Sequence, residues 1–156
     1  MNTECLRIAD QLRRAFEGKA WHGPSLKELL ADVTAEQAHA RPVTHAHSIW
    51  ELVSHIEVWM LAAADATLGV AMPVIVGTEK DWPAETDTGK VSWAKTMASL
   101  FANAAQLAHA VGEFGDARLN ETVPGRQYNF YYLFHGVVQH SLYHGGQIAF
   151  VKKSLT

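Results

Sequence analysis

The sequence predicts an all-α protein, a four-helix bundle with short extra helical turns and one long crossing connection. Three observations favour this fold. Four long segments repeat apolar residues at helical spacing, no segment alternates convincingly as a strand, and glycine and proline punctuate the stretches between them. The chain has 156 residues, of which 48% are hydrophobic and 19% charged, enough for one buried core. We therefore predict a single domain over residues 1–156.

The N-terminal part of the chain predicts one long helix and two brief ones. Residues 3–17 carry the first apolar stripe, and Gly18 follows as a stop signal. Ser25, with Glu28 three residues later, has the pattern of a capping box and opens a short helix over residues 26–31. Thr34 is placed to cap another brief turn.

Residues 48–68 predict the second long helix, with Ser48 as its capping residue and Glu51 three positions on. Residues 69–90 contain repeated glycine and proline and exceed the usual loop length. We expect this long crossing connection to pack over a site or to join helix ends that are not adjacent.

The C-terminal half predicts two further long helices. Residues 91–112 have the clearest helical spacing in the chain, and we expect Gly112 and Gly115 to end that helix. Residues 116–126 are predicted to be a loop. The last helix is expected over residues 128–153, where two closing lysines suit a helix C-terminus.

Composition excludes several classes of protein. Thirteen Lys and Arg stand against 16 Asp and Glu, a formal net charge of −3, and no basic cluster offers a surface for nucleic acid. No apolar run approaches the roughly 20 residues that span a bilayer. The single cysteine, Cys5, and an N-terminus without a signal-peptide pattern predict a cytoplasmic protein. No nucleophile elbow, P-loop, dinucleotide fingerprint or HExxH motif is present.

Nine histidines are the unusual feature of the composition. His140 and His144 fall within the apolar arc of the last helix, and a spacing of four residues places their rings on one side. His55 lies at the edge of the apolar stripe of the second long helix. Two imidazoles from one helix and a third from another form a candidate metal site. The alternative is that they are core histidines with ordinary hydrogen bonds.

Other residues are weaker candidates for the site. Glu51 lies one helical turn before His55, where it is either a general base, a partner of the ligands or simply a helix cap. His47 precedes the same helix and could approach the site from its mouth, and His22 could contact substrate from its loop. His39 and His109 are expected to be solvated, and His135 to lie on the surface or in an interface.

Three segments resemble those of a known family. Residues 47–59 (HSIWELVSHIEVW) resemble the second-helix signature of the DinB-like (DinB/YfiT) superfamily. Residues 140–148 (HSLYHGGQI) resemble its closing H-x-x-x-H-x-G-Q-I motif, and the loop at 21–26 (WHGPSL) fits one of its subgroups. The two main motifs occur in the expected order, and the helix layout covers nearly the whole chain.

The resemblance implies an up-down-down-up helical bundle, often dimeric. It also implies one divalent metal ion on His55, His140 and His144. Zinc or nickel is the first expectation, with iron or manganese as further options. Relatives include bacillithiol-dependent S-transferases, a mycothiol-dependent maleylpyruvate isomerase, and domains joined to sulfoxide synthases.

The expected function is therefore that of a divalent-metal-dependent enzyme, a transferase or hydrolase, that acts on a small-molecule substrate. Three imidazoles leave a coordination position open, so the metal could activate a low-molecular-weight thiol cofactor or a water molecule. The thiol-dependent S-transferase or isomerase type comes first. A metal-dependent hydrolase and a non-catalytic metal- or ligand-binding stress protein are the alternatives, and a scaffold whose histidines have no function is a further one.

Substrate contacts and assembly complete the expectations. Trp21, Trp50, Trp59 and Trp82 could furnish apolar walls, and Arg126 could bind a cofactor carboxylate. A basic group at the pocket would favour a thiol, and its absence would favour the other chemistries. The aromatic start of the last helix, residues 128–132, predicts a homodimer, since aromatic residues are enriched in interfaces.

Overall fold

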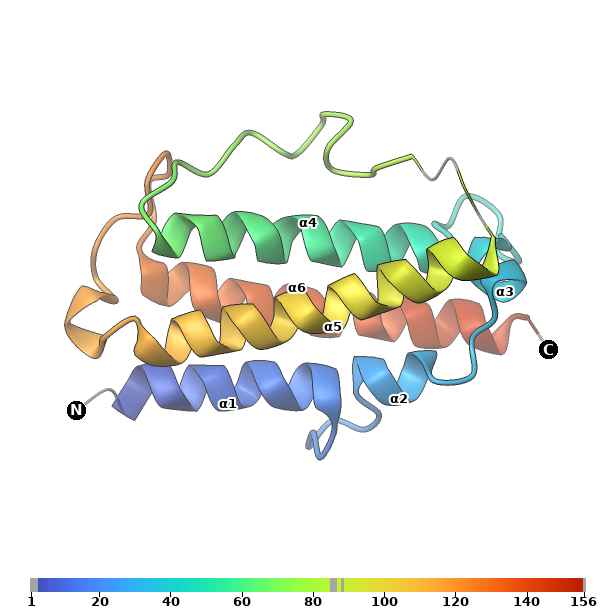
Figure 1. The fold of residues 1–156 in the computed structure, drawn as a ribbon, viewed down its shortest axis with the longest axis horizontal. Helices are drawn as coiled ribbons and strands as arrows, with labels where there is room; N and C mark the ends of the chain where they lie inside the picture. The colour runs from blue at the N-terminus through green and yellow to red at the C-terminus, as the bar shows by residue number, and fades with distance from the viewer. Residues whose placement is uncertain (1–2, 85–86, 88, 156) are drawn as a thin grey trace.

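The computed structural model describes residues 3–84, 87 and 89–155, and within them the regular structure is helical (Figure 1). Residues 85, 86 and 88 of the predicted crossing connection, and residues 1, 2 and 156 of the predicted domain, lie outside the described part. An isolated bridge between Thr122 and Asn129 is the one β-type pairing in the described residues. The helices are α1 (Thr3–Glu17), α2 (Leu26–Leu30), α3 (Ala35–His39), α4 (Ile49–Thr67), α5 (Lys90–Glu113), a 3-10 turn η1 (Asp116–Arg118) and α6 (Phe130–Lys153).

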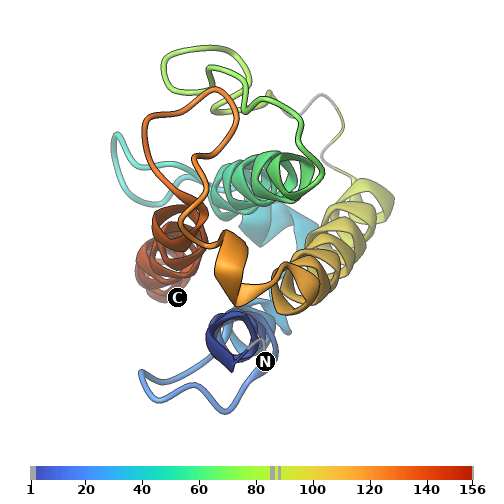
Figure 2. The ribbon, with the colours of Figure 1, turned by 90° about the vertical axis from the view of Figure 1, so that its left-hand side faces the viewer.

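The four long helices lie along the longest axis of the molecule. In Figure 1, α1 and α6 run from left to right, whereas α4 and α5 run from right to left. Because α4 and α5 point the same way, the chain between them must return along the whole length of α4. The end-on view in Figure 2 places α1, α4, α5 and α6 around a common centre, with this connection on the outer side of α4.

Local capping explains why most helices begin where they do. The side chains of Ser25, Thr34 and Ser48 each accept a hydrogen bond from the backbone N–H three residues on. In return, the side chain of that third residue accepts a hydrogen bond from the backbone N–H of the capping residue. These three capping boxes satisfy donors that the first helical turn leaves unpaired. The predicted starts of α2, α3 and α4 are confirmed to the residue or within one.

The ends of α5 and α6 differ from the prediction. Gly112 lies inside α5 and faces α1, where an added Cβ would make an ordinary contact with Leu6 at 3.6 Å, so this glycine does not end the helix. Gly115, with a positive φ of 95°, follows the end instead. The predicted loop at 116–126 contains η1, and α6 starts at Phe130 because Asn129 caps it.

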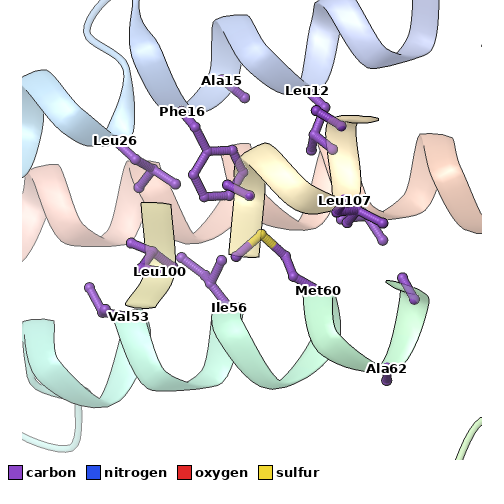
Figure 3. Packing of buried hydrophobic residues seen from close by; sticks show 14 of the residues in the cluster. Leu12, Ala15, Phe16, Leu26, Val53, Ile56, Met60, Ala62, Leu100 and Leu107 are labelled. Carbon is purple, nitrogen blue, oxygen red and sulfur yellow. The ribbon is translucent and has the colours of Figure 1, made fainter. Parts of the chain in front are cut away.

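The apolar core fills the space between the helices. Figure 3 shows Phe16 of α1 together with Ile56 and Met60 of α4, all at most 1% exposed, pointing into this space. Leu100 of α5 packs into the same cluster. None of the helices in the described part is long and apolar enough to cross a membrane.

Candidate metal centre

Three histidines from two helices converge beside the core. His55 comes from α4, and His140 and His144 come from successive turns of α6. Their ring nitrogens all lie within 4.8 Å of one another. The Nε2 atom of His140 is 3.0 Å from the Nε2 of His55 and 3.1 Å from the Nε2 of His144. The same ring atom of each histidine therefore faces one shared point.

Neighbouring acceptors fix two of these rings in the orientation a metal ligand needs. The Nδ1 of His55 lies 2.6 Å from the backbone carbonyl oxygen of Asp81, and the Nδ1 of His144 lies 2.6 Å from Oε1 of Gln147. Because both oxygens only accept hydrogen bonds, both Nδ1 atoms carry the proton. The Nε2 atoms of His55 and His144 then present lone pairs to the shared point, as in known metal sites.

Burial favours the uncharged rings of His140 and His144. His55 and His144 are 5% and 6% exposed. Burial lowers the pKa of His140 from 6.5 to about 3, with further contributions from the nearby His144 and His55 rings. The pKa of His144 is also lowered, chiefly by burial. Neutral imidazoles are the form that binds a metal ion, so the donor set fits one at neutral pH.

The crossing connection packs over this cluster. The indole of Trp82 stacks on the imidazole of His55 at 4.0 Å between ring centroids and on that of His47 at 3.4 Å. The carboxylate of Asp81 lies 3.3 Å from Nδ1 of His55 and is mostly buried. The connection therefore fills both roles expected of it, because it covers a site and joins distant ends of α4 and α5 (Figure 1).

A cavity of about 390 Å³ opens beside the cluster. His55 and His140 form one end of it, next to Asp81. Its remaining walls are mostly aromatic and aliphatic. They are Trp59, Val76, Trp82, Tyr128, Tyr132, Leu133, Gly136 and Val137.

The family follows from a sequence comparison. The profile of the DinB superfamily matches residues 20–148, a span that includes the three converging histidines and the cavity walls. The chain belongs to the DinB superfamily. No curated protein and no solved structure gives a significant match.

Three of the predicted candidates lie away from the histidines of this DinB-superfamily site. The carboxylate of Glu51 accepts from the backbone N–H of Ser48 and from Arg41, so it closes the capping box of α4. Trp50 is fully buried and packs against Trp93 of α5, with 5.0 Å between ring centroids. Arg126 donates to the backbone carbonyls of Met72, Pro73 and Gly125 and so joins two loops.

The loop residues predicted to contact substrate, Trp21, His22 and His47, lie in three different surroundings. Trp21 is fully exposed. His22 lines a smaller pocket with Pro24, Leu26 and Gly145, a different pocket from the one at the histidine cluster. His47 reaches the site through its stack on Trp82. Of the residues predicted to contact substrate or to furnish apolar walls, Trp59 and Trp82 line the cavity beside the histidines, within the described residues.

Sequence reasoning did not place at the site several residues that the fold brings there. Asp81 lies 26 positions from His55 in a segment without helical pattern, so no spacing rule links them. Tyr132 and Gly136 were detectable. They continue the line of His140 and His144 at four-residue steps along α6, which places all four on one side of the helix.

Proposed function

We propose that this protein is a divalent-metal-dependent enzyme in which His55, His140 and His144 hold one metal ion. The observation that carries the proposal is the fixed tautomer of two rings. Carbonyl oxygens hold the proton of His55 and of His144 on Nδ1, which leaves both Nε2 lone pairs facing His140. Ordinary core histidines have no need to present their lone pairs to one point.

The ligand set favours a catalytic rather than a structural metal. A bound divalent ion would act as a Lewis acid that lowers the pKa of a coordinated water molecule or thiol. The protein supplies three ligands, whereas structural zinc sites close the shell with four. The adjoining cavity offers space for a substrate, and Trp82 shields the cluster on the side of α4. Imidazole ligands suit zinc or nickel, with iron or manganese as further options.

The cavity supports activation of water over activation of a thiol cofactor. Thiol cofactors of cells carry carboxylates or other charged groups, which need a cationic partner. Arg126 was the predicted partner, but backbone carbonyls hold its guanidinium. Among the described residues that line the cavity there is no Lys or Arg. We therefore place a hydrolase-type reaction on a small molecule first and the thiol-dependent transferase second.

We also propose an up-down-down-up four-helix bundle that pairs as a homodimer in the cytoplasm. The helix directions in Figure 1 support this topology. Tyr132 and Tyr143 of α6 are both 66% exposed, which supports an interface on that helix. The single cysteine, Cys5, is buried and free, as suits a reducing compartment.

Elemental analysis of purified variants tests the metal site. Wild type, reconstituted in turn with zinc, nickel and manganese, should retain one ion, and His55→Ala, His140→Ala and His144→Ala should each lose it. His39→Ala and His109→Ala serve as matched controls, because both side chains are exposed. The protein should carry no metal-binding affinity tag. Retention of none of the three metals by wild type contradicts the proposal.

A further inference from the structure

We propose that the cavity beside the three histidines takes an uncharged aromatic or aliphatic small molecule, and that Gly136 keeps the space for it. The idea that this molecule reacts there rests on the proposed function. Its binding does not, because the walls that would hold it are side chains of the protein rather than the metal.

The walls determine what the cavity can hold. Four aromatic residues line it, Trp59, Trp82, Tyr128 and Tyr132. Aliphatic side chains fill most of the remaining wall. The volume of about 390 Å³ lies within the range of ligand pockets, which is about 300–1,000 Å³. A ligand of one or two fused rings fits such a volume and would bury apolar surface against these walls.

The charges around the cavity disfavour an ionic ligand. Of the described lining residues, Asp81 is the one that is ordinarily charged at neutral pH, and its side chain is mostly buried. Lys80, next to it in sequence, lines a different pocket with Glu79. In the metal-free protein, an anionic ligand would lose hydration without gaining a cationic partner and would meet the carboxylate of Asp81. Trp82 offers no free face to a cation, because His47 and His55 cover both sides of its ring.

Gly136 is the specific feature of this cavity. A glycine inside a helix costs about 1 kcal/mol relative to alanine, so its presence in α6 calls for a reason. At Gly145 an added Cβ would lie in ordinary contact with a packed neighbour, 3.6 Å from Leu26. At Gly136 an added Cβ would meet nothing within 4 Å, and the residue lines the cavity between Tyr132 and His140. The absent side chain leaves room for a ligand.

Three naphthalene probes test this class of ligand on the metal-free protein. They share one ring system and differ in charge: 2-naphthalenemethanol, 2-naphthoate and 2-naphthylmethylammonium. Equilibrium dialysis should give the alcohol a Kd at least about tenfold lower than that of either ion. Tighter binding of the carboxylate or the ammonium compound than of the alcohol overturns the proposal, and so does the absence of binding by all three.

Variants at two glycines locate the binding. Gly136→Leu should weaken binding of the alcohol by about tenfold or more, and Gly136→Ala should weaken it less. Gly146→Leu is the matched control, because Gly146 lies on the same helix with the same open space and does not line this cavity. Gly146→Leu should leave the Kd of the alcohol within about twofold of the wild-type value. Equal effects at the two positions, with circular dichroism confirming that both variants are folded, place the probe elsewhere and overturn the proposal.

Metal content in the same variants separates this inference from the proposed function. Gly136→Leu should retain the metal ion, since it alters no ligand. Binding of the alcohol by a wild type that retains no metal supports the cavity and removes the enzyme mechanism. A wild type that retains metal but binds no probe supports the metal site and overturns the proposed ligand class of the cavity.

Discussion

The two sides of α4 serve different purposes. Toward α1 and α5, α4 presents Ile56 and Met60 to the apolar core (Figure 3). Toward α6 it presents His55 to two other imidazoles. The first side is explained by removal of apolar surface from water. The second side keeps three polar rings in a buried place, which stability alone does not require.

Removal of a large core side chain should give the largest effect on stability. Phe16 is 1% exposed, and Phe16→Ala should lower the free energy of unfolding by about 3–5 kcal/mol. Urea denaturation of the metal-free protein measures this difference. Metal should stabilise this variant as much as it stabilises wild type, since the core and the histidines are separate. A variant that folds but no longer responds to metal would show that the two sides are coupled.

Removal of a hydrogen-bond acceptor at the site should instead reduce metal affinity. Gln147 accepts from Nδ1 of His144, so Gln147→Leu frees that ring to turn and to change tautomer. Such contacts contribute roughly 10–100-fold to metal affinity. Metal-linked stabilisation, about 2.7 kcal/mol at a hundredfold excess over Kd, should shrink in this variant.

Thermal denaturation with and without metal measures this loss. Gln139→Leu, at an exposed position of the same helix, is the matched control and should respond to metal like wild type. An unchanged metal response in Gln147→Leu would show that the contact with His144 does not position that ring.

The smallest expected effect is on the pH dependence of the metal-free protein. The pKa of His140 is 6.5 in an unperturbed chain and about 3 in the fold. Between these values the unfolded chain binds more protons, so the free energy of unfolding falls as the pH falls. Above about pH 6.5 this contribution to stability is fully present.

Urea denaturation at about pH 7 and about pH 5 measures this slope. His140→Gln should reduce the loss of stability between the two, because it removes the group whose pKa the fold lowers. His109→Gln, at an exposed position of α5, should keep the wild-type difference. A wild type that gains stability on acidification would contradict a lowered pKa of His140 in the fold.

The local parts of both regions could be predicted from the sequence. Helix starts follow from capping residues within one turn, and the pairing of His140 with His144 follows from their four-residue spacing. Both depend only on geometry within a single helix. The identity of the family likewise follows from two contiguous motifs, and the comparison over residues 20–148 confirms it.

The tryptophans show where such reasoning stops. Trp50 was expected to line the site, but it is fully buried against Trp93, because α3 and α5 cover α4 on that side. The sequence evidence that placed Trp82 at the site was no stronger than that for Trp50, and yet Trp82 stacks on His55. Helical spacing gives the direction of a side chain around its own helix. It does not tell which neighbouring element covers that side.

By itself, the sequence determined the helices, their apolar sides and the three histidines as a candidate set. The tertiary structure decided which oxygens orient the rings, that Asp81 and Trp82 cover His55, and that Gly136 borders a cavity. The physical reason is the range of the interactions involved. Capping and helical spacing act within a few residues, whereas the path of a long irregular connection depends on contacts with helices far away in the chain.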